Sequence, residues 1–203
     1  MKRLPLLISV VLMLSCSACG TKTVDVRARF NASDAQYISQ NGRNKIEILG
    51  FVRIPSGGIS LCSDFPVELW PVTDFSRELV KGIAGSENGG EYVYFIHPLY
   101  GMEITESLEY RRFREYVMAS PCDADGRAAF AGVPDGEYYV YLYMTWNDLG
   151  PSILPGILPG NIPMAGHIVD RVRVAGGQTL QHTLSRAQDD SAPYYKKSRV
   201  IPD

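Results

Sequence analysis

This sequence of 203 residues lacks most of the features that point to an enzyme or to a nucleic-acid-binding protein. It has only three histidines, and it contains neither an HExxH nor a GxSxG motif, which argues against the zinc proteases and serine hydrolases built on them. A formal net charge of −2 offers no excess of basic residues for nucleic acid. No apolar run after residue 19 is long enough to cross a bilayer. These absences favour a globular domain without an evident reactive centre.

The first 19 residues, MKRLPLLISVVLMLSCSAC, resemble a bacterial lipoprotein signal peptide. A lysine and an arginine provide the positive start, and residues 4–14 form an apolar run that is short for a permanent membrane span. The predicted lipidation site is Cys16 or Cys19, because an aliphatic residue lies upstream of the first and small residues precede the second. An ordinary cleaved secretory signal is the alternative.

The signal predicts where the mature protein resides. Neither Ser17 nor Gly20, which would follow the lipidated cysteine, is the aspartate that retains such lipoproteins at the inner membrane. We therefore expect a lipid-anchored protein of the outer membrane, facing the periplasm or the surface, since each buried methylene of the acyl chains contributes about 0.8 kcal/mol. Such export would allow Cys62 and Cys122 to form a disulfide, although two buried free thiols would also suit the sequence. These two cysteines are not spaced as CxxC, which argues against a metal site.

In the rest of the chain, apolar and polar residues alternate as is typical of β-strands, and glycines and prolines interrupt this pattern. Nine short strands are expected, and they make the domain all-β. Residues 74–90 and 147–166 read as loops, a helical turn is expected soon after residue 105, and residues 187–203 read as a disordered tail. The expected strands are 24–30, 45–54, 65–73 (short or at a sheet edge, because of its prolines), 91–99, about 112–122, 127–130, 138–146, 167–177 and 178–186.

Residues 122–146, CDADGRAAFAGVPDGEYYVYLYMTW, contain two turn signatures, DADG and VPDG, around one short strand. With Phe130 and the following GEYYV, this stretch resembles the transthyretin-like family, which includes carboxypeptidase regulatory-like domains and B-type repeats of collagen-binding adhesins. IEILGFVR and VELWPVT fit the family's first strands. The resemblance covers residues 45–186 and implies a single antiparallel β-sandwich, preceded by a strand or linker at 20–44.

The resemblance also carries two expectations about chemistry. Cys122 stands where the family usually has threonine, which supports a Cys62–Cys122 disulfide. Such modules mostly act as stalks, spacers or interaction domains, so the family implies no catalytic residue and no cofactor.

Candidate site residues each have a structural alternative. Asp123, Asp125 and Glu137 suit turn capping better than calcium binding. The three histidines lie far apart in the sequence, with no motif of a catalytic triad beside them. The glutamates of 103–115 could supply a carboxylate pair for glycoside hydrolysis, but they alternate with arginines, as on an exposed face. The aromatic residues could pack the core or line a groove for glycan or protein; they are Trp70, Tyr92, Tyr94, Phe95, Tyr138, Tyr139, Tyr141, Tyr143 and Trp146.

An apolar loop supplies the predicted contact surface. SILPGILPGNIPMAG cannot pair regularly because of its prolines and glycines, and it either covers a sheet edge or binds a partner. The predicted partner-binding residues are Ile153, Leu154, Ile157, Leu158 and Trp146. The sequence thus predicts a non-catalytic, lipid-anchored binding or structural module that contacts another envelope protein. A small envelope enzyme or accessory domain acting on peptidoglycan or glycan, and a carrier of a small apolar ligand, are the alternatives.

Overall fold

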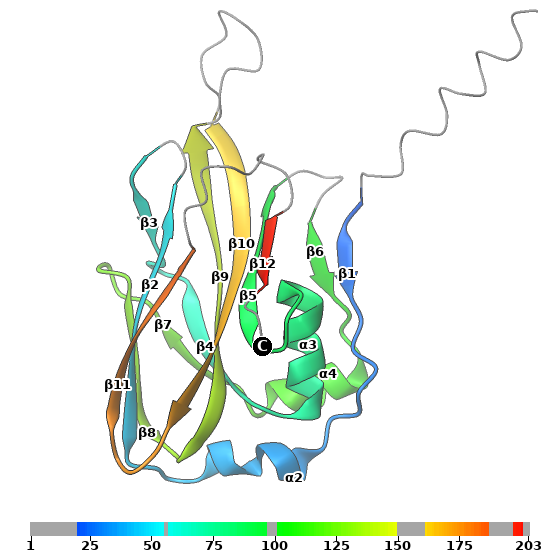
Figure 1. Ribbon diagram of the computed structural model, residues 1–203, viewed down its shortest axis with the longest axis vertical. Coiled ribbons are helices and arrows are strands. Elements are labelled where there is room, and N and C mark those ends of the chain that lie inside the picture. Colours follow the sequence, from blue (N-terminus) through cyan, green and yellow to red (C-terminus); the bar gives the residue numbers. More distant parts are fainter. Residues whose placement is uncertain (1–19, 55–56, 97–100, 150–160, 187–196, 201–203) are drawn as a thin grey trace, which may run out of the picture.

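Most strands of this protein form two stacked sheets, two others form a small third sheet, and helices cover the outer face of the largest sheet (Figure 1). The computed structural model describes residues 20–54, 57–96, 101–149, 161–186 and 197–200. Within these ranges the elements are β1 (Lys22–Val24), α2 (Ala32–Ala35), η1 (Gln36–Ser39), β2 (Asn44–Arg53), β3 (Ile59–Leu61), β4 (Pro66–Pro71), α3 (Asp74–Ala84), β5 (Gly89–Phe95), β6 (Met102–Ile104), α4 (Leu108–Arg114), β7 (Met118–Pro121), β8 (Arg127–Val133), β9 (Gly136–Leu149), β10 (Asn161–Val174), β11 (Thr179–Arg186) and β12 (Lys197–Val200).

The larger sheet has the strand order β12-β5-β10-β9-β4-β7 and is antiparallel throughout. The smaller sheet is built on β2, which pairs with β11 on one side and with β8 and β3 on the other. A β-sandwich is thereby confirmed. The expectation of a purely antiparallel, all-β domain is wrong in two respects: β11 pairs with β2 in parallel, as β1 does with β6, and the fold includes the helices α3 and α4.

The core of the sandwich lies between the two sheets. Alternate residues of β2, among them Ile46 and Ile48, face alternate residues of β9 and β10, among them Val140, Leu142 and Ile168. Each of these side chains is at most 2% exposed. At roughly 25 cal/mol per Å² of buried apolar surface, this interdigitated layer is the main source of stability.

The segment 74–90, expected to be a loop, contains the eleven-residue helix α3 instead. The Thr73 hydroxyl accepts a hydrogen bond from the Ser76 backbone N–H, and the Ser76 hydroxyl accepts one from the Thr73 N–H. Gly85 ends the helix with a φ of 87°. Phe75 and Leu79 lie on its buried face, one turn apart, against the larger sheet. The cap, the terminating glycine and the four-residue spacing were all present in the sequence as helix signals.

Strand β9 presents a different set of side chains to each of its two faces. Val140 and Leu142 point into the sandwich, whereas Tyr139 and Tyr141 point to the helix-covered face, and all four are at most 8% exposed. The expected strand 138–146 is therefore confirmed. Because successive residues of a strand face opposite ways, the odd-numbered tyrosines form a separate aromatic surface.

The disulfide between Cys62 and Cys122 is confirmed, with the two Cα atoms 5.8 Å apart. It joins the connection between β3 and β4 to the connection between β7 and β8, inside the sandwich core. Around it, the Asp64 backbone N–H donates to the Cys122 carbonyl and the Cys122 N–H donates to the Phe65 carbonyl. The bridge thus holds together two irregular segments that few ladder hydrogen bonds connect.

Several expected boundaries differ from the observed ones. The prediction of a strand at 24–30 is wrong, since β1 covers 22–24 and overlaps it only at Val24. The strand expected from about Arg112 begins only at Met118, because helix α4 occupies the residues before it. β4 is short, as expected, but lies between β9 and β7 rather than at an edge. Its two prolines stand at its ends, where a missing N–H interrupts no central ladder bond. Residues 197–200, within the expected tail, pair with β5 as β12.

No helix among the described residues is long and apolar enough to span a membrane.

Candidate functional site

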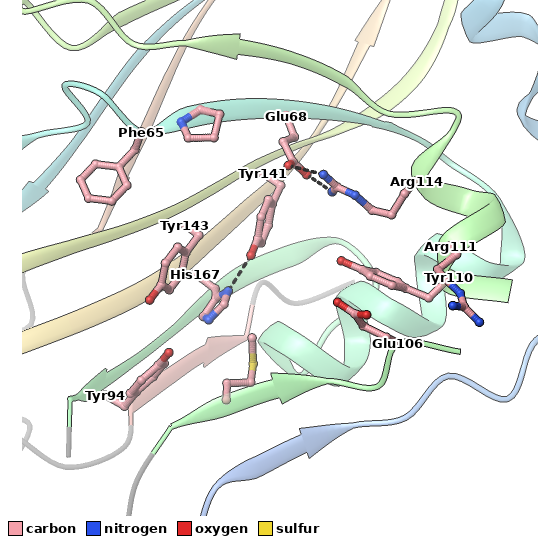
Figure 2. Close-up of a pocket in the computed structure, with 12 residues that line it drawn as sticks. Phe65, Glu68, Tyr94, Glu106, Tyr110, Arg111, Arg114, Tyr141, Tyr143 and His167 are labelled. Carbon is pink, nitrogen blue, oxygen red and sulfur yellow. Dashed lines mark hydrogen bonds and ion pairs between the residues drawn. The ribbon is translucent and has the colours of Figure 1, made fainter. Parts of the chain in front are cut away.

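A cleft of about 610 Å³ opens over the part of the larger sheet that the helices leave uncovered (Figure 2). Its floor comes from strands β5, β9 and β10, one wall from the start of β4, and the other walls from α4, next to β4, and from β6. The lining residues are Phe65, Pro66, Glu68, Tyr94, Met102, Glu106, Tyr110, Arg111, Arg114, Tyr141, Tyr143 and His167.

The floor of the cleft is a cluster of aromatic rings. Tyr143 lies directly across the ladder from His167, with ring centroids 4.8 Å apart, and Tyr94 stacks near the same imidazole at 6.0 Å. Tyr143 is 36% exposed, so its ring is open to a ligand. Tyr141 lies deeper and stacks on Trp70 at 4.3 Å, where burial raises the pKa of its phenol. The ring surface is therefore a fixed platform supported from below by the sheet.

His167 is the most informative residue of the cleft. Its side chain is only 5% exposed, and Nδ1 lies 2.7 Å from the Tyr141 hydroxyl, whereas Nε2 has no hydrogen-bond partner. Burial, together with the nearby charge of Lys22, lowers the pKa of His167 to about 3. The imidazole is therefore neutral at physiological pH, and Nε2 is a buried polar atom without a protein partner in the floor of the cleft.

An ion pair forms the wall next to the aromatic platform. The Arg114 guanidinium donates to both carboxylate oxygens of Glu68, with Nη2 2.8 Å from Oε1. The Trp70 indole N–H donates to Oε2 of Glu68 at 2.7 Å. This pairing raises the pKa of Arg114. Glu68 is 8% exposed, so the charge-assisted bonds compensate its burial and hold α4 against β4.

The net charge of the cleft is close to zero. Glu68 and Arg114 neutralise each other, and the outer wall adds one glutamate, Glu106, and one arginine, Arg111. Burial raises the pKa of Tyr94, and its interaction with Tyr143 raises that pKa further, so the Tyr94 phenol remains uncharged. The cleft therefore suits an uncharged ligand with both apolar faces and hydroxyl groups.

The residues singled out from the sequence are placed as follows. The Asp123 carboxylate accepts hydrogen bonds from the Asp125 and Arg127 backbone N–H groups, as turn capping requires. Across the described ranges no group of three or more His, Cys, Asp or Glu side chains could hold a metal ion. Trp146 is 6% exposed and packs in the sandwich core, so it does not lie on a contact surface. The other predicted contact residues, Ile153, Leu154, Ile157 and Leu158, lie outside the described residues.

The aromatic residues divide between the two roles considered for them. Tyr138 and Trp146 pack in the sandwich core, while Tyr94, Tyr141 and Tyr143 line the cleft. Sequence reasoning did not identify His167 or the Glu68–Arg114 pair as site residues. The available signal was the tyrosine at every second position of β9, which marks one face as aromatic; only the pairing of β9 with β10 brings His167 to that face.

No protein-family model matches this sequence, and no curated protein matches it either. A solved structure from Pseudomonas aeruginosa, of a candidate carbohydrate-binding protein, is similar to this chain with a TM-score of 0.60. The two proteins share a fold. The similarity covers 78% of this chain and 99% of the other, at 22% sequence identity. At that identity the comparison supports the architecture, and the chemistry of the cleft must be argued from its own residues.

Proposed function

We propose that this protein is a non-catalytic binding module of the bacterial cell envelope, anchored by a lipid on Cys16 or Cys19, whose cleft binds a neutral carbohydrate. The sandwich would be of the transthyretin-like type, on the strength of the DADG and VPDG turns and the strands beside them. The observation that carries the proposal is the unpartnered Nε2 of His167 within a platform of tyrosine rings.

The chemistry of a sugar complements this arrangement. Ligand clefts in this size range typically combine aromatic surfaces with a few polar groups that fix orientation. The apolar C–H face of a pyranose can pack on the Tyr143 ring, and aromatic side chains favour such contacts because they bury much area. A sugar hydroxyl both donates and accepts, so it can pair with Nε2 of His167 in either tautomer.

The non-catalytic assignment rests on Glu68, the buried one of the two carboxylates that line the cleft; Glu106 lies exposed on the outer wall. Both oxygens of Glu68 accept hydrogen bonds, from Arg114 and from Trp70. A general acid or a nucleophile for glycoside hydrolysis needs a carboxyl group that can approach the scissile bond. Glu68 is instead positioned as a structural element that fixes the wall of the cleft. The similarity in fold to a candidate carbohydrate-binding protein is in keeping with a binding role.

The test is a binding measurement on a panel of neutral and uronate-containing oligosaccharides. We expect neutral members to bind, and Tyr143→Ala to weaken that binding about tenfold, as the loss of roughly 1.4 kcal/mol of stacking would produce. Ile59→Ala, at an exposed apolar residue of the other sheet, is the control and should leave affinity unchanged. Binding of no oligosaccharide at millimolar concentration, equal weakening by both variants, or hydrolysis of a bound member would refute the proposal.

A further inference from the structure

Exposed apolar side chains gather at one end of the sandwich. In the described ranges the exposed large hydrophobic residues are Ile59 (56%), Leu61 (37%), Ile96 (43%), Leu108 (64%) and Tyr143 (36%). Tyr143 belongs to the cleft and Leu108 begins α4. The other three, Ile59, Leu61 and Ile96, lie on β3 and just beyond the end of β5.

These three residues share an end of the molecule with the start of β1, and we call it the tether end. Figure 1 shows the β2–β3 turn, the end of β5 and the starts of β6 and β1 at the upper end, with α2 and α4 toward the other end. The pairings agree: Ile59 pairs with Arg53 at the end of β2, and the Ile96 backbone N–H donates to the Pro163 carbonyl at 2.7 Å, near the start of β10.

The chain that leaves this end toward the predicted lipid anchor is short. Lys22 is fixed to the body of the protein, because its N–H donates to the Gly101 carbonyl and its ammonium donates to the Ile83 carbonyl, both at 2.9 Å. Only three residue steps separate Lys22 from Cys19, and six separate it from Cys16. At about 3.5 Å per residue, the acylated cysteine lies within roughly 10 to 20 Å of β1.

We propose that the tether end docks on the lipid bilayer that holds the anchor, with Ile59, Leu61 and Ile96 entering the headgroup region. This inference rests on the lipid anchor of the proposed function. Scattered single apolar residues on a surface are ordinary, but three at the end that a short tether must bring to the membrane find an apolar phase there. Docking would hold the cleft, whose wall includes Met102 at the start of β6, close to the membrane surface.

The experiment uses the full acylated protein in phospholipid vesicles that contain a lipid with a nitroxide-labelled headgroup. A fluorophore is attached through Arg53→Cys at the tether end, or through Leu108→Cys at α4 as the matched position. We expect quenching at position 53 to exceed quenching at position 108 at least threefold. Adding Ile59→Ser and Ile96→Ser should reduce quenching at position 53 by half or more, whereas Leu108→Ser should not change it.

The outcomes separate the docking from the anchor. Mass spectrometry of the purified protein reports the acyl groups. With the acyl mass present, equal quenching at both positions, or quenching at position 53 that the two serine substitutions do not reduce, would overturn the docking and leave the anchor standing. A protein that lacks the acyl mass and does not float with the vesicles would overturn the anchor, and the docking with it.

Discussion

Replacing both Cys62 and Cys122 with alanine is predicted to lower the free energy of unfolding by about 4 kcal/mol. The bridge closes a sequence separation of 60 residues. In the chain-entropy model, the entropy that such a cross-link removes from the unfolded chain is about 14 cal/mol/K, or about 4 kcal/mol at 25 °C. That is a large share of the roughly 5–15 kcal/mol that stabilises a typical domain.

Because of where the bridge lies, we expect the double alanine variant to lose the whole of this free energy of about 4 kcal/mol. Both cysteines are nearly inaccessible, and the segments they join are held by backbone hydrogen bonds at Asp64, Phe65 and Cys122, so the native geometry persists without the bond. The loss should therefore come chiefly from the larger freedom of the unfolded state. The same freedom exposes more surface on unfolding, so the denaturant m-value should increase.

Urea unfolding of the oxidised parent protein and of the double alanine variant, followed by tryptophan fluorescence, measures both quantities. Reduction of the parent protein under native conditions should give a midpoint close to that of the variant. A loss of less than about 1 kcal/mol, or an unchanged m-value, would show that the unfolded chain is not restricted by the bridge in the way the model assumes.

Three further changes test other parts of the structure. The folded state keeps His167 neutral down to a pKa of about 3, whereas in the unfolded chain this side chain gains a proton below about pH 6.5. As the pH is lowered between these values, the free energy of unfolding should therefore fall by up to about 1.4 kcal/mol per pH unit. His167→Gln should flatten that slope in thermal unfolding measured from pH 7 to 4, and an unchanged slope would contradict the buried neutral imidazole. Gly42→Ala would place a Cβ 2.1 Å from the Val133 carbonyl group and should lower the free energy of unfolding by roughly 1–3 kcal/mol or more, because the backbone cannot make room for it. Gly20→Ala, with nothing within 4 Å, should be neutral in the same denaturation assay. Thr73→Ala removes the N-cap of α3 and should cost about 1 kcal/mol, with comparable stability of the two proteins in urea counting against the capping box.

The sequence predicted the sandwich because its signals are local. The alternation in β2 and β9 and the turns at DADG and VPDG depend on neighbouring residues, and each appears where expected. The prediction of a loop at 74–90 was wrong although the cap at Thr73 and the end at Gly85 are local helix signals, because the segment ends in GSENGG, which is typical of a loop. The parallel pairing of β11 with β2 could not be read from either strand, since nothing within a strand specifies the direction of its partner.

The cleft could not be predicted from the sequence, for a different reason. Glu68, Tyr94, Arg114 and His167 come from four elements spread over 100 positions, and they meet only because β9 pairs with β4 on one side and with β10 on the other. A histidine in an apolar strand is more often packed and satisfied than available to a ligand. What distinguishes His167 is the single unpartnered nitrogen, which depends on the tertiary arrangement.

The strict alternation of β9 also constrains how this protein can change. Substitutions at position 143 can alter the surface of the cleft while positions 142 and 144 keep the sheets together, so the two properties can change independently. A deletion of one residue before Tyr141 would reverse that alternation and send the hydroxyl-bearing rings inward and the aliphatic side chains outward. The side chains that β9 presents to the cleft should therefore change through substitutions and almost never through a change in the length of the strand.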